Sequence, residues 1–218
     1  MTYHADFLDA EQRVADAIPE RDVNPFSGPS TMRRRVLVSQ DGEPVIVLCL
    51  FVALEEGRWI VEQCFSGIMN NDKTIAILYG QHVHLFDTDS YQVKSLFLDD
   101  YVGHIYSIPD VWDHKASLSE NFLVTTFQYT FLINVSSGII WRSEPCGIDG
   151  VIIHDIREGI IYGSGEWDPP DGWAPFNLRL SDGHRPEANS ASGFTFMPDG
   201  GYASTPYPAY KTSNINMF

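Results

Sequence analysis

Leu132-Ile133-Asn134-Val135-Ser136-Ser137-Gly138 is an alternating apolar run that ends in a short polar turn. A run of this kind predicts one half of a β-hairpin. Three other stretches share the pattern when they are aligned at their last residue, namely 36–42, 85–91 and 176–183. The four last residues, 42, 91, 138 and 183, lie 49, 47 and 45 positions apart. A period in the mid-forties predicts repeated antiparallel units, each of about four strands.

The rest of the chain after residue 33 also consists of strand-like stretches separated by turns. Stretches rich in β-branched and aromatic residues are separated by Asp-Gly, Ser-Gly and Asn-Asn turns, and they span 36–38, 45–50, 59–61, 74–79, 83–86, 92–98, 122–135 and 139–141. Such residues favour strands. No segment here keeps a helical period for three turns. The sequence therefore predicts a mainly all-β body.

The first thirty residues are expected to differ from that body. The apolar residues of 2–18 fall near one side of a helical projection, which predicts an amphipathic helix that ends before Pro19. The stretch 24–29 is rich in turn formers and predicts a linker. We therefore expect three parts: a helix with its linker over 1–30, a repeat-built β domain over 31–205, and a Pro/Tyr-rich tail over 206–218.

A hairpin repeat of this length resembles the blades of WD40-like and quinoprotein-like β-propellers. Two further stretches fit the resemblance: 160–165 is similar to an inner blade strand, and 194–202 to the entry of a blade. The Trp-Asp signature is absent from the hairpins. The resemblance covers 33–205 and implies a small or incomplete propeller-like array of about four hairpin units. The alternative is an irregular sandwich or barrel in which the turn spacing is coincidental.

The charge balance narrows the class of partner. With 29 Asp and Glu against 14 Lys and Arg, the formal net charge is −15. Binding to nucleic acid needs clusters of Lys and Arg that release counterions, and the chain has one short cationic run, at 33–35. We therefore expect no nucleic-acid partner. A strongly acidic protein instead attracts a basic one.

Three further features predict a cytoplasmic protein that does not enter a membrane. No stretch approaches 18 apolar residues without a charge. The first residues lack the basic region and apolar core of a secretory signal. Cys49, Cys64 and Cys146 are odd in number and far apart, which favours buried free thiols in a reducing compartment.

The densest polar and aromatic stretch is 165–176. Its Pro-Pro and Asp-Gly pairs predict a stiff exposed loop. Large rings held on a stiff loop lose little entropy on binding, so this loop is a candidate contact with a cationic partner. The residues that we expect to make the contact are Glu166, Trp167, Asp168, Asp171 and Trp173. The alternative is a loop whose Trp rings pack on neighbouring hairpins.

Two other stretches pair carboxylates with large rings, and they extend the candidate surface. Aromatic anchors within an acidic surround suit an interface with a basic protein, because rings provide buried area and charge raises the rate of encounter. The residues are Asp99, Asp100, Tyr101, Asp110, Trp112 and Asp113.

The motifs of catalysis and of metal binding are weak. His82 and His84 share a face on a strand, and we interpret them as polar residues on the solvent side of a hairpin rather than as metal ligands. There is no nucleophile elbow, no Walker loop and no dinucleotide fingerprint, so we expect no cofactor. The remaining enzymatic interpretation is a carboxylate-based hydrolase that uses Glu166 and Asp168.

The overall character of the chain, small, acidic and β-rich, is similar to that of bacterial polymorphic-toxin immunity proteins. The stretch from Gly163 to Pro170 and on to Gly183 resembles segments of small bacterial proteins of that sort. The resemblance implies a non-enzymatic inhibitor that neutralises a basic effector or toxin domain. The alternatives are a propeller-like scaffold for protein binding and the hydrolase described above.

Overall fold

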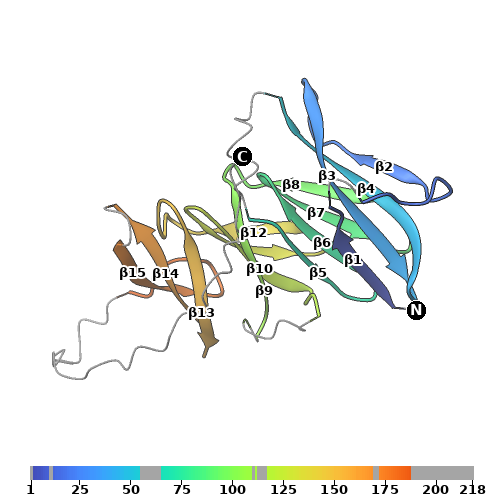
Figure 1. Cartoon of the computed structure of the whole chain (residues 1–218). Coiled ribbons are helices and arrows are strands. Elements are labelled where there is room, and N and C mark those ends of the chain that lie inside the picture. The colour runs from blue at the N-terminus through green and yellow to red at the C-terminus, as the bar shows by residue number, and fades with distance from the viewer. Residues whose placement is uncertain are drawn as a thin grey trace. The chain divides into compact units, whose positions relative to one another are not determined.

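The computed structural model describes residues 2–9, 12–54, 65–109, 111, 117–168 and 172–187. The chain divides into two units, Met1–Pro186 and Glu187–Phe218, and all the strands named below lie in the first. The described residues form fifteen strands and no helix (Figure 1), so the prediction of an all-β body is confirmed. It follows that none of them forms an apolar helix long enough to cross a membrane.

Three of the four sheets are meanders in which each strand pairs with the one before it in the chain. The second sheet contains β5 (Gly67–Asn70), β6 (Thr74–Tyr79), β7 (His82–Asp87) and β8 (Val93–Phe97). The third contains β9 (Val102–Ser107), β10 (Asn121–Thr126), β11 (Thr130–Asn134) and β12 (Gly138–Arg142). The fourth contains β13 (Val151–Arg157), β14 (Ile160–Trp167) and β15 (Gly172–Arg179).

The first sheet has another topology. Its strands are β1 (Tyr3–Phe7), β2 (Glu20–Val23), β3 (Ser30–Gln40) and β4 (Glu43–Ala53), and their order is β1-β3-β4-β2. The strand β1 pairs antiparallel with β3, whereas β2 pairs parallel with β4. Two strands that precede the first hairpin thus lie at its two edges.

The predicted N-terminal helix is wrong for the described part of residues 2–18. Residues 3–7 alternate between buried and exposed side chains, which is the period of a strand, and β3 offers them a paired edge. The apolar residues that suggested a helical stripe instead cover one face of the first sheet. Leu8, Val14 and Ile18 pack on Val47 and Cys49, on the face of the first sheet turned away from the second. Tertiary packing decides the structure here, not local helix propensity.

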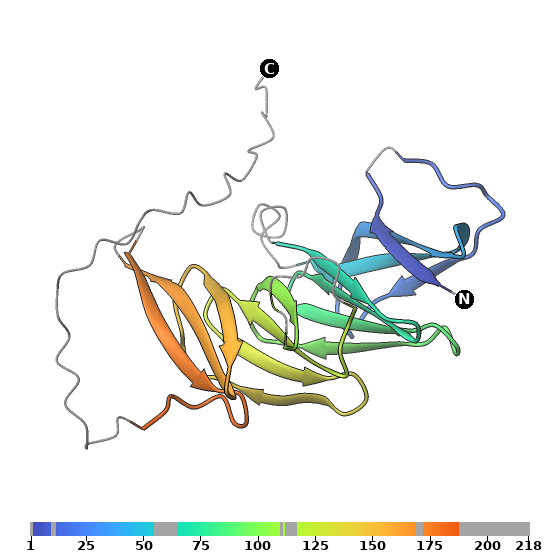
Figure 2. The same cartoon turned by 90° about the horizontal axis from the view of Figure 1, so that it is seen from below.

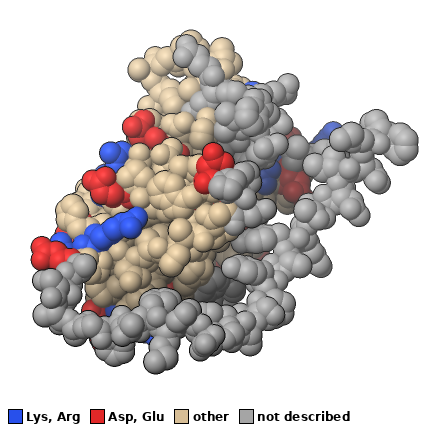
Figure 3. Space-filling view, turned by 90° about the vertical axis from the view of Figure 1, so that its left-hand side faces the viewer, with Lys and Arg blue, Asp and Glu red and all other residues tan. Residues whose placement is uncertain are grey.

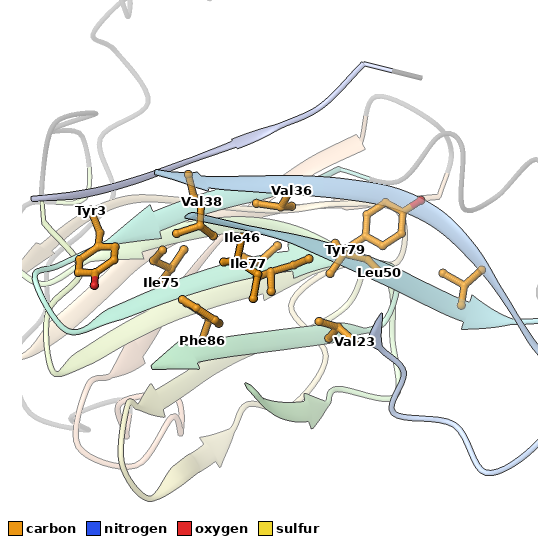
Figure 4. Packing of buried hydrophobic residues seen from close by; sticks show 13 residues of the cluster. Tyr3, Val23, Val36, Val38, Ile46, Leu50, Ile75, Ile77, Tyr79 and Phe86 are labelled. Atoms are coloured by element: carbon orange, nitrogen blue, oxygen red, sulfur yellow. The ribbon is translucent and has the colours of Figure 1, made fainter. Parts of the chain in front are cut away.

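The first and second sheets share a hydrophobic core. Val36, Val38 and Ile46 from the first sheet and Ile77 and Phe86 from the second are all nearly or fully buried. Figure 4 shows these side chains between the ribbons of the two sheets. Alternation along β6 and β7 sends the intervening residues to the opposite face.

Those intervening residues build the next core. Leu78 and Val83 of the second sheet pack with Phe122 and Val124 of the third. The third sheet in turn packs with the fourth through a core that includes Leu123, Leu132, Ile153, Phe176 and Leu178. The sheets therefore follow one another in chain order, and the second and third are buried on both faces (Figure 2). None of the four closes on itself.

The four turns that reveal the repeat in the sequence share a backbone conformation. Their last residues, Gly42, Tyr91, Gly138 and Gly183, all have positive φ, of 90°, 59°, 97° and 72°. In two of them the closing hydrogen bond has the same span, from Tyr91 N to the carbonyl oxygen of Asp87 and from Gly183 N to that of Arg179, each 2.8 Å. The left-handed conformation is why three of the four positions are glycine.

Candidate binding surface

Four of the residues predicted to form the contact lie outside the described residues, namely Asp110, Trp112, Asp113 and Asp171. The other seven fall into two groups. Glu166, Trp167, Asp168 and Trp173 surround the turn between β14 and β15, and Asp99, Asp100 and Tyr101 lie between β8 and β9.

Glu166 and Trp173 are cross-strand partners in the fourth sheet. The Trp173 side chain is 40% exposed, and Asp168, just past the end of β14, is exposed. The residue Gly150 makes room for both side chains of the pair. A methyl group added to it would lie 3.3 Å from Trp173 Cη2 and 3.9 Å from Glu166 Oε2. Trp173 is thus an exposed ring held in a defined place beside a carboxylate.

The pair lies on the face of the fourth sheet that is turned away from the third. Phe176 and Leu178 of β15 point into the core, so the alternate residues Trp173, Pro175 and Asn177 point outward. Tyr162 and Ser164 of β14 lie on the same outward face, beside Asn177 and Pro175. We call this surface the outer face, and its members are Ile152, Asp155, Arg157, Ile160, Tyr162, Ser164, Glu166, Trp173, Pro175, Asn177 and Arg179.

The outward faces of the first and fourth sheets differ in whether other residues cover them. The outward face of the first sheet is covered by Leu8, Val14 and Ile18. Within the described ranges, no hydrophobic cluster covers the outer face of the fourth sheet. In Figure 3, which views the molecule from the side of the fourth sheet, the described surface is mainly tan, and charged side chains are scattered over it. Within the described residues, the first sheet thus buries apolar groups on its outward face, whereas the outer face of the fourth sheet leaves Trp173 40% exposed.

The arginines near the outer face are already engaged. Arg157 Nε lies 2.7 Å from an Asp155 carboxylate oxygen, and its guanidinium lies over the Tyr162 ring at 4.7 Å. Arg179 bonds to Asp182 at 2.8 Å, and this contact lowers the pKa of the Asp182 carboxyl. Each of these cations thus has an acidic neighbour, and the exposed carboxylate of Asp168 lies at the end of this face.

In the second group, the carboxylate of Asp99 is exposed, whereas that of Asp100 has a structural role. Asp99 is exposed and has a φ of 58°. Asp100 is only 8% exposed, and its two carboxylate oxygens accept hydrogen bonds from the backbone N–H groups of Tyr101, at 2.9 Å, and Gln128, at 2.8 Å. Asp100 therefore fastens the turn before β9 to the turn after β10.

Backbone contacts place both groups at the same end of successive sheets. Gln128, bonded to Asp100, accepts a hydrogen bond from Cys146 N at 2.7 Å. Ile148, two residues further on, donates to the carbonyl oxygen of Glu166 at 2.8 Å. A row of acidic residues follows this path, and we call it the acidic rim: Asp99, Glu144, Asp149, Glu166 and Asp168.

Three residues of this end, Glu144, Ile148 and Asp149, were not predicted from the sequence. Ile148 is 37% exposed, and both carboxylates are exposed. The segment that holds them lacks the dense aromatic and acidic composition of 165–176. What unites them with Glu166 is the backbone pairing of Ile148 and Gly150 with that residue, at 2.8 and 2.9 Å, which only the fold shows.

The interpretation of His82 and His84 as residues on a solvent face is wrong. Both are buried, because the face of β7 that they share meets the first sheet. Within the described residues, no group of three His, Cys, Asp or Glu side chains is placed to hold a metal ion. Cys49 and Cys146 are buried and free, as predicted for these two thiols.

Comparison with models of known protein families gives no match, and comparison with curated proteins gives none either.

Proposed function

We propose that this chain is a non-enzymatic acidic binding protein, an immunity or inhibitor protein that neutralises a basic effector or toxin domain in the cytoplasm. The observation that carries the proposal is the position of the acidic rim at one end of an outer face that has exposed apolar groups. Rim and face meet at the cross-strand pair of Glu166 and Trp173. The free thiols of Cys49 and Cys146 suit a reducing compartment.

The two parts of this surface have different tasks in binding. A net charge of −15 accelerates the encounter with a cationic protein, and the rim orients it. Exposed rings and aliphatic side chains then provide the buried area that slows dissociation. Trp173 and Ile148 are such groups, at 40% and 37% exposure. We expect Trp173 to be the principal anchor, since truncating a buried Trp at an interface costs about 2 kcal/mol or more.

The partner is proposed to dock on the face of the fourth sheet, not along its edge. Arg179 N donates to the carbonyl oxygen of His184, so the backbone of Arg179 points away from β14. Alternate residues of a strand point their backbone groups to the same edge, which includes Pro175. Proline has no N–H, so the middle of this edge lacks the donor that an added strand needs.

The finer architecture is also a proposal. We infer that the four sheets are arranged like the blades of an incomplete β-propeller. In such an array the turns of neighbouring sheets stay at fixed distances from one another. The meander order of the second, third and fourth sheets supports this, as does the shared positive φ at the four repeated turns. Among the described residues, no hydrophobic cluster covers the outer face at the end of this array, and this face would receive the partner.

The proposal is tested with the protein encoded by the adjacent gene as the binding probe. Calorimetry should give a nanomolar Kd, and Trp173→Ala should weaken binding roughly 30-fold or more. Ile140→Ala is the matched control, because Ile140 is 48% exposed on the third sheet, away from the outer face. Equal losses in both variants, or no binding of the probe, would contradict the proposal.

A further inference from the structure

Two histidines stack on the face of the second sheet that meets the first. His82 and His84 are two residues apart on β7, and their ring centroids lie 5.6 Å apart with an angle of 9° between the ring planes. Phe97 of β8 lies 5.2 Å from the His82 ring. Phe26, from the segment that follows β2, meets the same ring edge-on at 5.2 Å. The stack therefore joins the segment between β2 and β3 to the second sheet.

Neither ring of the stack can take up a second proton without burying an N–H group that has no acceptor. His82 is 6% exposed and His84 is 1% exposed. His84 Nδ1 lies 2.8 Å from Ser95 Oγ, and the described residues offer no hydrogen-bond partner to His84 Nε2 or to either nitrogen of His82. An imidazolium donates from both nitrogens, so protonation would bury an N–H group without an acceptor. Burial lowers the pKa of His82 to about 4 and that of His84 to about 3.

The elements packed against the stack offer no compensating negative charge. The residues that face the two rings from neighbouring strands are Ile77 and Tyr79 of β6 and Ser95 and Phe97 of β8. From the first sheet, β2 brings a cation, Arg21, whose guanidinium donates to the carbonyl oxygen of Tyr91 in the turn between β7 and β8. A proton on either ring would therefore meet a buried apolar surround and a second imidazole.

The element with the weakest attachment at this junction is β2. It has four residues and pairs with one neighbour, β4. Its contacts with the second sheet are the buried Val23 and the Arg21 hydrogen bond, followed along the chain by the Phe26 ring. The second and third sheets, in contrast, are buried on both faces. Local opening draws on the least stabilised elements first.

We propose that the His82–His84 stack is an acid-sensitive latch: protonation of either ring releases Phe26 and β2 from the second sheet while the sheets behind it stay folded. This regulation is independent of the proposed partner. Each proton taken up on opening makes the opening equilibrium about tenfold more favourable per pH unit below about 6.5.

Hydrogen exchange of the full chain, followed by mass spectrometry between about pH 7.5 and about pH 4.5, tests the latch. After correction for the intrinsic exchange rate, amides of Glu20–Val23 should lose protection about tenfold or more per pH unit below about pH 6.5, and at every pH they should exchange faster than those of β10 and β11. His82→Phe retains a stacking ring that cannot be protonated, so it should make the loss shallower. His4→Gln is the control, because the His4 side chain is 70% exposed.

Two results would overturn the proposal. In one, β2 and the core strands have the same protection at every pH, which means that β2 opens only by global unfolding. In the other, protection of β2 does not change with pH in the natural sequence. The natural sequence alone decides between these results, so the test stands even where His82→Phe fails to fold.

Discussion

Glu166 and Trp173 are cross-strand neighbours at the last turn of the fourth sheet, with Gly150 beside Glu166. The geometry depends on close backbone packing, because the neighbouring segment 146–150 runs directly beside β14. A carboxylate and a large ring are thereby fixed side by side at the meeting point of the acidic rim and the outer face.

Gly165→Ala should unfold the end of the fourth sheet. A Cβ atom at this position would lie 1.8 Å from the carbonyl oxygen of Cys146, which is backbone and has no flexible end to move aside. We expect a loss of at least about 3 kcal/mol in the free energy of unfolding, measured by urea titration. Gly28→Ala, with no atom within 4 Å of its new methyl, should change it by less than about 0.5 kcal/mol. Equal effects in the two variants would contradict the packing described here.

Asp100→Ala should lower stability, because it leaves two partly buried backbone N–H groups, those of Tyr101 and Gln128, without their acceptor. An unsatisfied buried donor costs about 1–3 kcal/mol. Asp99→Asn is the matched control, since Asp99 is exposed and asparagine tolerates its positive φ. Chemical denaturation should separate the two variants by about 2 kcal/mol. A stable Asp100→Ala protein would mean that Asp100 does not fasten these turns.

Global stability should fall as the pH is lowered from about 6.5 towards about 4. Burial depresses the pKa of His82 to about 4 and of His84 to about 3 in the folded state, so the unfolded chain binds more protons over this range. The slope reaches at most about 1.4 kcal/mol per pH unit for each histidine. The double variant His82→Phe, His84→Asn should have a flatter profile in urea titrations at several pH values. An unchanged profile would show that these rings do not govern it.

The sequence predicts the all-β class and many of the described strands, because both depend on local signals. Alternating residues and left-handed turn positions such as Gly138 and Gly183 are readable without knowledge of the fold. The N-terminal segment could not be assigned this way. Tyr3–Phe7 becomes a strand only because β3 provides an edge, and Leu8, Val14 and Ile18 are buried only because a sheet face needs cover.

In the candidate surface, too, some features can be predicted from local sequence and others depend on the fold. Composition was sufficient to single out Glu166, Asp168 and Trp173, which the fold brings to one end of the outer face. Composition could not separate exposed Asp99 from buried Asp100, since the difference lies in hydrogen bonds to a turn 28 residues away. Nor could it reveal that His82 and His84 are buried, because alternation assigns a residue to one of two faces without saying which is covered.

The most direct test of the central claim is the association rate constant with the protein encoded by the adjacent gene, measured by stopped flow from about 50 to about 500 mM NaCl. The account predicts a fall of at least about tenfold over this range, and a clearly smaller fall for the triple variant Asp149→Asn, Glu166→Gln, Asp168→Asn. Glu43→Gln with Glu120→Gln, which removes exposed carboxylates outside the rim, should retain most of the salt dependence. A rate constant that is independent of salt, or equally altered by both sets of substitutions, would contradict the account.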